Sequence, residues 1–308
     1  DDTGSDDDTE GDDDTGGDDD TADDDEGDDD DTGDDDGGDD DNTAPPPHPL
    51  ADVELYINLG DSLAAGYNAT GNNGSGGHGY ARLLVDNHPV YSAYNGATLT
   101  AVSGGVYFYD VSDSGTTSAE ILANLEDALD DSLPAMVNGD VLLTISAGGN
   151  DFNDSIWTMV TPALASAAAD ELALNLTQMI SAVRARYEDP GAGVQVIPVL
   201  INIQDPTGGT MSIPAQFEEG FCETIQHPAL QAVGGLVLSN LQTMNDAIEA
   251  AAMAQGGQVA DMHAAFMDHG MNETGADRWL SDDCAHPNDE GPHPVRREIW
   301  GTVTGVGF

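Results

Sequence analysis

The amino-acid sequence predicts an α/β protein in which helices cover both faces of a mostly parallel sheet, preceded by a disordered acidic tail. Short apolar runs alternate with helical patterns through residues 51–308, and this alternation is typical of parallel βαβ units. Residues 140–148 (DVLLTISAG) form a continuous apolar run, as in strands that are buried on both faces. Residues 1–45 have no aromatic side chain and no aliphatic one beyond alanine, so they cannot form a hydrophobic core.

The first half of the domain begins with a short apolar strand, residues 53–59 (VELYINL), and a helical pattern starts just after Ser62. Residues 106–112 (VYFYDVS) are β-branched and aromatic, which favours a strand. Residues 114–131 open with Ser-Gly-Thr-Thr-Ser and then repeat apolar residues at helical spacing. They predict a helix that leads to the buried strand 140–148.

The second half of the domain continues the same alternation. Residues 163–189 have the pattern of a long amphipathic helix, closed by Pro-Gly-Ala-Gly, and residues 194–201 (VQVIPVLI) form the next strand. Residues 238–257 predict a helix with a glycine stop. Residues 258–266 (QVADMHAAF) predict a short strand, and residues 288–305 predict a terminal helix.

The acidic residues are concentrated at the N-terminus. Residues 1–41 contain 26 of the 59 acidic residues and no basic residue. The rest of the chain contains the other 33 acidic residues, six arginines and no lysine. Such a segment is extended by its own charge, and the run NTAPPPHP (42–49) stiffens the junction. We therefore expect a disordered tail and linker over residues 1–50 and one domain over residues 51–308, which is long enough for a substantial core.

This charge also limits the partners. A polyanion repels nucleic acid and anionic membrane surfaces, which argues against both. The tail lacks the alternating ligand spacing and the closing glutamate of a dedicated Ca²⁺ loop, so weak binding of cations is the most that we expect of it. No apolar run reaches the ~18 residues that a membrane span needs. We also expect the protein to be a monomer.

The location of the protein follows from the same composition. The chain starts with Asp rather than Met, so we expect that any signal peptide has been removed. An acidic, lysine-free chain with a long tether suggests secretion or tethering at the cell surface, for example through a lipid anchor upstream of residue 1. In an exported protein the pair Cys222 and Cys284 favours a disulfide, whereas in a cytosolic one it favours two thiols. Two cysteines alone are too few for a structural zinc site.

Ser62 is the first candidate catalytic residue. It follows the apolar run in Gly60-Asp61-Ser62, where an Asp or Ser before a helix is also an ordinary N-cap. A serine at the first turn of a helix can instead use backbone N–H groups and the helix dipole to stabilise an oxyanion. The tripeptide alone leaves both interpretations open.

A C-terminal stretch supplies the partners that a nucleophilic serine needs. In DDCAHPNDEG (282–291), Asp283 stands three residues before His286, so its carboxylate can orient the imidazole that activates the serine. The adjacent Asp282 is instead interpreted as a solvated loop acid. The other histidines lack this spacing and are interpreted as surface or packing residues: His78, His88, His227, His263, His269 and His293.

Two further stretches follow predicted strands and could stabilise negative charge. Residues 148–151 (GGND) are turn residues, but Asn150 also offers an amide donor toward an oxyanion. Gly115 offers an unobstructed backbone N–H at the start of its helix. Ligands of parallel sheets bind outside the carboxyl ends of the strands, so we expect these residues to meet Ser62 at one edge.

Four stretches together resemble the four blocks of the SGNH/GDSL hydrolase family. They are LGDSLAAGY (59–67), DVSDSGTTS (110–118), ISAGGND (145–151) and DDCAHPNDEG (282–291), in that order. One departure is that family members often carry asparagine shortly before the glycine of the second block, where this chain has VSDSG. The resemblance spans nearly all of residues 51–308.

The resemblance implies a flavodoxin-like three-layer α/β/α sandwich and a serine ester hydrolase without metal or cofactor. It implies that Ser62 is the nucleophile, that His286 is the base and that Asp283 orients it. The backbone N–H groups of Ser62 and Gly115 and the side chain of Asn150 would form the oxyanion hole.

The substrate is expected to be a small-molecule, glycan or lipid ester. Residues 66–80 are rich in Gly and Asn and could rim the pocket, and residues 217–230 are interpreted as an insertion that a Cys222–Cys284 bond would pin against the catalytic loop. No long apolar surface helix indicates a lipase lid, which favours short- to medium-chain acyl esters. The alternatives are a carbohydrate O-deacetylase and a non-catalytic binding domain. The presence of all four residue types at the site argues against the binding domain.

Overall fold

The structure is a computed structural model, and it describes residues 48–68, 79–87, 96–157 and 161–307. The predicted disordered tail lies outside these residues for positions 1–47, as does most of the predicted rim loop 66–80. Within the described ranges, no helix is both long and apolar enough to cross a membrane.

A parallel sheet forms the centre of the domain, as predicted. Its described strands are β1 (Val53–Gly60), β2 (Tyr107–Ser112), β3 (Asp140–Ser146), β4 (Val196–Ile201) and β5 (Gln258–Ala260). They are ordered β2-β1-β3-β4-β5, and every neighbouring pair is parallel. This order places β1 and β3 in the interior, where strands are covered on both faces and must be apolar.

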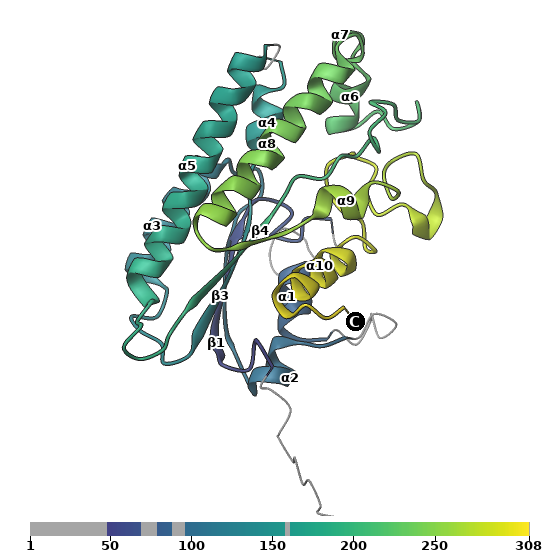
Figure 1. Cartoon of the computed structure of the whole chain (residues 1–308). Helices are drawn as coiled ribbons and strands as arrows, with labels where there is room; N and C mark the ends of the chain where they lie inside the picture. Colours follow the sequence, from purple (N-terminus) through teal and green to yellow (C-terminus); the bar gives the residue numbers. More distant parts are fainter. Residues whose placement is uncertain (1–47, 69–78, 88–95, 158–160, 308) are drawn as a thin grey trace, which may run out of the picture. The chain divides into compact units, whose positions relative to one another are not determined.

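Helices cover both faces of this sheet, which confirms the α/β class (Figure 1). Leu55, Ile57 and Leu59 of β1 pack toward one face, while Tyr56 packs toward the other, because successive side chains of a strand alternate. The helices with bounds in chain order are α1 (Tyr80–Val85), α2 (Leu99–Ser103), α3 (Ser118–Asp131), α4 (Gly149–Ser155), α5 (Pro162–Tyr187), α6 (Phe221–Gln226), α7 (Pro228–Gln231), α8 (Gly234–Ala254), α9 (Met262–Phe266) and α10 (Pro292–Thr304), with a 3₁₀ turn at Gly275–Asp277.

The two helical layers have separate cores. Helices α3, α5 and α8 supply the apolar side chains of the first core, which contains Leu125, Leu176 and Ile248. Helices α1, α2, α9 and α10 supply the second, which contains Leu84, Phe266 and Ile299. The sheet is therefore the middle of three layers, as the predicted α/β/α sandwich requires.

Two predicted elements differ from the structure. The helix expected just after Ser62 is wrong: residues 62–68 form hydrogen-bonded turns, because Gly66 and Asn68 adopt positive φ values of 69° and 64° that end a helical path. The strand expected over residues 258–266 ends at Ala260. Asp261 then caps α9 by accepting a hydrogen bond from the Ala264 N–H at 3.0 Å, so the remainder is helical.

The other differences concern boundaries and short helices. Helix α8 begins at Gly234, earlier than the predicted residue 238, and α3 begins at Ser118 because Gly115 has φ 87°. Strand β3 ends at Ser146, before Gly148 turns the chain with φ 109°. A side chain at Gly148 would also lie 2.9 Å from Leu172. The helices α1, α2, α4, α6 and α7 were not predicted, because short helices carry little periodicity.

Candidate active site

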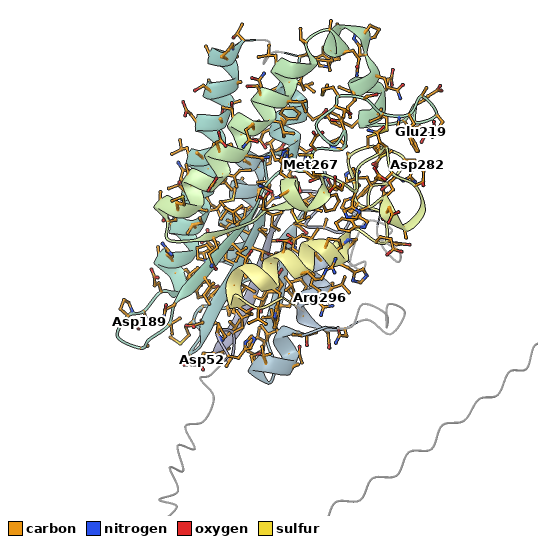
Figure 2. All side chains as sticks on the ribbon, turned by 45° about the vertical axis from the view of Figure 1, so that its right-hand side comes forward. Asp52, Asp189, Glu219, Met267, Asp282 and Arg296 are labelled. Atoms are coloured by element: carbon orange, nitrogen blue, oxygen red, sulfur yellow. A yellow bond between two sulfur atoms is a disulfide. The ribbon has the colours of Figure 1, made fainter. Side chains whose placement is uncertain are left out.

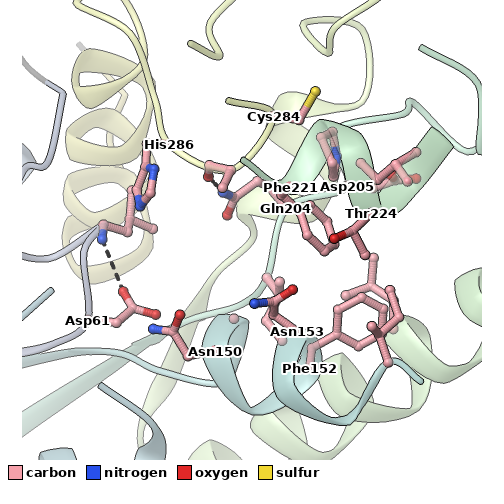
Figure 3. A pocket seen from close by; sticks show the side chains of 18 of the residues that line it. Asp61, Asn150, Phe152, Asn153, Gln204, Asp205, Phe221, Thr224, Cys284 and His286 are labelled. Carbon is pink, nitrogen blue, oxygen red and sulfur yellow. Dashed lines mark hydrogen bonds between the residues drawn. The ribbon is translucent and has the colours of Figure 1, made fainter. Parts of the chain in front are cut away.

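The predicted site residues lie at the carboxyl edge of the sheet, where ligands of parallel sheets bind. Ser62 follows β1, Gly115 follows β2 and Asn150 lies in the first turn of α4, directly after β3. His286 lies in the loop before α10. Ser62, Asn150 and His286 line one cavity, and Figure 3 shows Asn150 and His286 in it. Gly115 and Asp283 are not among its lining residues, although Asp283 contacts His286 from behind.

The turn at Ser62 is shaped by the two residues before it. Gly60 has φ 150°, and a Cβ there would collide with the carbonyl oxygen of Ser146, so the position requires glycine. The Asp61 carboxylate accepts hydrogen bonds from the Leu63 N–H and the Ser146 hydroxyl, each at 3.1 Å. Ser62 is thereby held at the cavity wall with 9 % of its surface exposed.

Asp61 is a buried acid next to the predicted nucleophile. Burial raises the pKa of its carboxyl to about 6, although the hydrogen bonds from Leu63 and Ser146 and the nearby His286 act in the opposite direction. The carboxylate of Asp151 adds a small further increase. Asp61 therefore changes charge within the range in which histidine bases also titrate.

His286 and Asp283 form the predicted acid–base pair. The Nδ1 atom of His286 lies 2.7 Å from Asp283 Oδ2. The other carboxylate oxygen accepts hydrogen bonds from the backbone N–H groups of Ala285 and His286, each at 3.0 Å. Burial alone would raise the pKa of Asp283, but these hydrogen bonds outweigh it and hold the pKa at about 2. Asp283 is therefore ionised and can orient the imidazole at neutral pH.

A disulfide joins Cys222 of α6 to Cys284, which stands between Asp283 and His286 in the chain. Both cysteines are fully buried. The segment that contains α6 also meets this loop through its backbone, because the Phe221 N–H donates to the Asp283 carbonyl at 3.0 Å. Glu219 and Asp282, on the two joined segments, lie at the same end of the molecule (Figure 2). The predicted insertion is thus held against the loop of the predicted base.

The two further predicted oxyanion donors are set in a network of their own. The Asn150 amide donates to the Thr116 carbonyl at 2.9 Å, next to Gly115, and an added Cβ at Gly115 would meet nothing within 4 Å. The neighbouring Asp151 accepts from the Ser118 N–H at 2.9 Å and from its hydroxyl. These hydrogen bonds connect the segment that contains Gly115 to helix α4, which contains Asn150.

The cavity extends from Ser62 and His286 into an apolar region. Its volume is about 350 Å³. Side chains of α4, α6 and α8 form the apolar walls, together with residues of the loop after β4: Phe152, Ile156, Ile203, Met211, Phe221, Ile225, Val237, Leu238 and Leu241. Polar side chains face the cavity from Asn153, Gln204 and Thr224 (Figure 3).

Two contacts of the Asp283–His286 pair were not predicted from the sequence. Asn68 donates to Asp283 at 2.9 Å, and the Tyr67 ring lies 4.5 Å from the His286 ring. Both residues fall at the start of the stretch that was interpreted as a pocket rim, and nothing in their spacing relative to His286 indicates the contact. Among the described residues, no group of three or more His, Cys, Asp or Glu side chains is arranged to hold a metal ion.

Comparison with known protein families gives one match. The model of the GDSL-like Lipase/Acylhydrolase family matches residues 59–292, a range that includes every predicted site residue. No curated protein matches the chain at a significant level.

Three solved structures with a similar fold share little sequence identity with this chain. An extracellular lipase from Streptomyces rimosus is 17% identical with a TM-score of 0.53, over 81% of this chain and 100% of the lipase. Phospholipase A1 from Streptomyces albidoflavus is 18% identical with a TM-score of 0.52, over 81% and 99% of the two chains. A variant of an acetyl xylan esterase from Geobacillus stearothermophilus is 16% identical with a TM-score of 0.50, over 83% and 96%.

Proposed function

Because this chain belongs to the GDSL-like lipase/acylhydrolase family and is a carboxylic ester hydrolase, we propose that it cleaves short- to medium-chain acyl esters through an acyl-enzyme on Ser62. The observation that carries the proposal is the cavity itself. Ser62 and His286 line it at one end, and apolar side chains of α4, α6 and α8 line the remainder. An ester can therefore present its carbonyl to the serine while its acyl chain leaves water.

The first half of the reaction forms the acyl-enzyme. Ser62 Oγ attacks the carbonyl carbon of the ester, and its proton passes to Nε2 of His286, while the Asp283 carboxylate at Nδ1 stabilises the imidazolium. The tetrahedral intermediate then expels the alcohol, which takes the proton from His286. The products of this half are the free alcohol and an ester between the acyl group and Ser62.

The second half releases the acid. Water gives a proton to His286 and attacks the carbonyl carbon of the acyl-enzyme, and the new intermediate expels Ser62, which recovers the proton. In both halves negative charge develops on the former carbonyl oxygen. The backbone N–H groups of Ser62 and Gly115 are proposed to stabilise it. The amide nitrogen of Asn150 carries two N–H groups, so its bond to Thr116 leaves the second as a donor for this oxygen.

The volume of the cavity supports an upper limit on the length of the acyl chain. Its volume of about 350 Å³ lies at the small end of the ~300–1,000 Å³ that is common for ligand pockets. Each methylene that enters its apolar part contributes about 0.8 kcal/mol, so a medium chain binds better than acetyl, while a long chain exceeds the space. The acetyl group that a carbohydrate O-deacetylase removes would leave the apolar walls without contacts. The preferred acyl-chain length therefore distinguishes the two functions in an experiment.

We also propose that the protein is secreted. The disulfide between Cys222 and Cys284 is of the kind that persists in oxidising compartments, and a similar fold occurs in an extracellular lipase. Detection of the activity in the culture medium of the source cells, rather than in washed cells, tests this proposal. The lipid anchor, the weak cation binding and the monomeric state remain predictions.

The test of the proposed function is hydrolysis of p-nitrophenyl acetate, butyrate, octanoate and palmitate by the wild type and by Ser62→Ala, in low and high salt. We expect the highest kcat/KM for butyrate or octanoate and no activity above background for Ser62→Ala. Highest activity on acetate, with acetate release from acetylated polysaccharide, would instead indicate the O-deacetylase. Equal rates of the two proteins would exclude the serine mechanism.

A further inference from the structure

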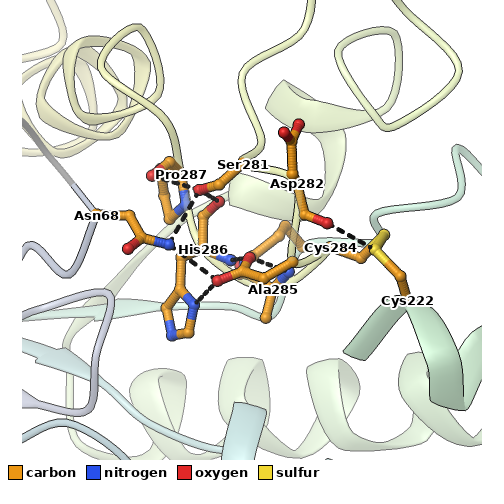
Figure 4. Close-up of polar contacts among 10 residues, drawn as sticks. Asn68, Cys222, Ser281, Asp282, Cys284, Ala285, His286 and Pro287 are labelled. Carbon is orange, nitrogen blue, oxygen red and sulfur yellow. Dashed lines mark hydrogen bonds and ion pairs between the residues drawn. A yellow bond between two sulfur atoms is a disulfide. The ribbon is translucent and has the colours of Figure 1, made fainter. Parts of the chain in front are cut away.

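The turn that carries Ser62 also contacts the loop that carries Asp283 and His286. The side-chain amide of Asn68 donates a hydrogen bond to Asp283 Oδ2 at 2.9 Å, the oxygen that lies 2.7 Å from His286 Nδ1. The same amide lies 3.3 Å from the hydroxyl oxygen of Ser281 (Figure 4). The ring of Tyr67 lies 4.5 Å from the imidazole of His286, measured between centroids, at an angle of 50°.

The backbone connects these contacts to the nucleophile over a short distance. The Tyr67 N–H donates to the Ser62 carbonyl at 2.9 Å, which closes the turn between the two residues. Gly66 and Asn68 then adopt positive φ values of 69° and 64°, a conformation in which glycine and asparagine are the residues most readily accommodated. Asn68 therefore directly follows the turn that the bond between Tyr67 and Ser62 closes.

Asn68 differs in origin from the other donors to the Asp283 carboxylate. Ala285 N–H, His286 N–H and His286 Nδ1 all belong to the loop that carries Asp283 itself. Of the described contacts of this carboxylate, the one with Asn68 comes from another part of the chain. The disulfide and the bond from the Phe221 N–H attach this loop to α6, whereas the bond from Asn68 attaches its carboxylate to the turn that carries Ser62.

We propose that Asn68 and Tyr67 are positioning residues that hold the Asp283–His286 pair in register with Ser62. Asn68 fixes the plane of the Asp283 carboxylate, and Tyr67 covers one face of the imidazole and limits its rotation. This inference rests on the proposed function of Ser62 and His286. A misplacement of about 1 Å at such a site can lower the rate about a hundredfold, so a modest restraint has a measurable effect on kcat.

The charges around His286 determine how a change at position 68 acts. Asp283 contacts the ring directly, Asp61 interacts with it through space, and the Tyr67 ring contacts it at a tilt of 50°. Arg278 and Asp282 pair with each other at 2.8 Å. A carboxylate at position 68 would add negative charge beside Asp283 and would favour the protonated imidazole. The rise of activity with pH would then move to higher pH.

The experiment uses the full chain with p-nitrophenyl butyrate and compares Asn68→Ala, Asn68→Asp and Asn138→Asp. Asn138 is an exposed asparagine that precedes β3 at the opposite edge of the sheet, so its variant repeats the change in charge away from the site. We expect Asn68→Ala to lower kcat about tenfold with little change in KM. We expect Asn68→Asp to raise the pH of half-maximal kcat/KM by about half a unit or more, and Asn138→Asp to leave it unchanged.

Tyr67 is tested by the pair Tyr67→Ala and Tyr67→Phe. If the ring acts by covering the imidazole, the alanine variant loses kcat and the phenylalanine variant recovers it. The inference is overturned if the Asn68 variants keep the wild-type kcat and pH profile while Ser62→Ala is inactive. If Ser62→Ala is itself as active as the wild type, the proposed function fails instead. Unfolding temperatures of all variants show that each protein is folded in the assay.

Discussion

Cys222 and Cys284 form a disulfide that joins a wall of the cavity to the loop between Asp283 and His286. Their separation of 62 residues predicts a loss of about 4 kcal/mol of unfolding free energy when the bond is removed, by the chain-entropy estimate. We expect the double variant Cys222→Ser and Cys284→Ser to unfold at lower denaturant concentration and to have a lower kcat. Urea unfolding followed by circular dichroism, together with the esterase assay, measures both. Wild-type protein that keeps its melting temperature and activity under reducing agent would contradict this prediction.

The acid–base pair predicts a graded loss of activity. Removing the proposed nucleophile by Ser62→Ala, or the proposed base by His286→Ala, should lower kcat about 10⁵-fold or more, since neither step of the proposed acyl transfer has a substitute group. Asp283→Asn should cost about 10³–10⁴-fold, because an amide neither holds the correct tautomer of His286 nor stabilises its charge. The matched control is Asp282→Asn on the adjacent exposed acid, which should stay within about twofold of the wild type. A wild-type rate for Asp283→Asn would exclude its orienting role.

The proposed base predicts how activity depends on pH. The proposed base His286 accepts a proton from Ser62 only when its imidazole is neutral, so kcat/KM should rise as the pH increases from acid to neutral. The measurement is the rate on p-nitrophenyl butyrate across this range, corrected for spontaneous hydrolysis. A flat profile would argue against a histidine base.

Asp61 predicts a dependence of stability on pH. Burial raises the pKa of its carboxyl from 3.8 to about 6, so between these values the folded chain keeps a proton that the unfolded chain has released. The contribution of Asp61 to the free energy of unfolding therefore falls as pH rises through this window, by about 3 kcal/mol in total. Asp283 has the opposite sign at lower pH: its pKa of about 2 gives stability that is lost as pH falls below about 4.

The variant Asp61→Asn isolates this contribution, because its amide oxygen can still accept the bonds from Leu63 and Ser146. We expect the variant to gain stability relative to the wild type at pH 7 and to gain less at pH 4. Urea unfolding at both pH values provides the measurement. An identical difference between the two proteins at pH 4 and pH 7 would show that Asp61 does not keep its proton on folding.

The apolar walls predict chain-length specificity. Leu238 of α8 lines the cavity and is only partly buried, so Leu238→Trp should fill space without disrupting the core. We expect it to lower the octanoate-to-acetate ratio of kcat/KM at least about tenfold, since each excluded methylene costs about 0.8 kcal/mol. Leu236→Trp, on the same helix but outside the cavity wall, is the control and should leave the ratio unchanged. Equal ratios in both variants would place the acyl chain elsewhere.

The sequence predicted those parts of the fold that depend on local pattern. The strand before Ser62 and the buried run that becomes β3 are apolar enough to be recognised alone, and the short interval between Asp283 and His286 brings them together within one loop. The turn after Ser62 was misassigned because its apolar and small residues fit a helix, whereas the positive φ of Gly66 and Asn68 ends it.

The parts that the sequence could not predict depend on contacts between distant segments. The apolar cavity is built from α4, α6 and α8, and two of these helices are too short to have a periodic pattern. The bond between Asn68 and Asp283 spans 215 positions of the chain. Such pairs are set by how the layers pack, which a single sequence does not record.

The order of the proposed catalytic parts along the chain has a consequence for biosynthesis. Ser62 follows β1, whereas His286 lies in the loop directly before α10. A ribosome therefore completes the proposed nucleophile long before the proposed base, and a chain truncated before residue 286 lacks the group proposed to deprotonate Ser62. With these proposed roles, ester cleavage begins only after the segment that carries His286 has been synthesised and has folded beside the turn that carries Ser62.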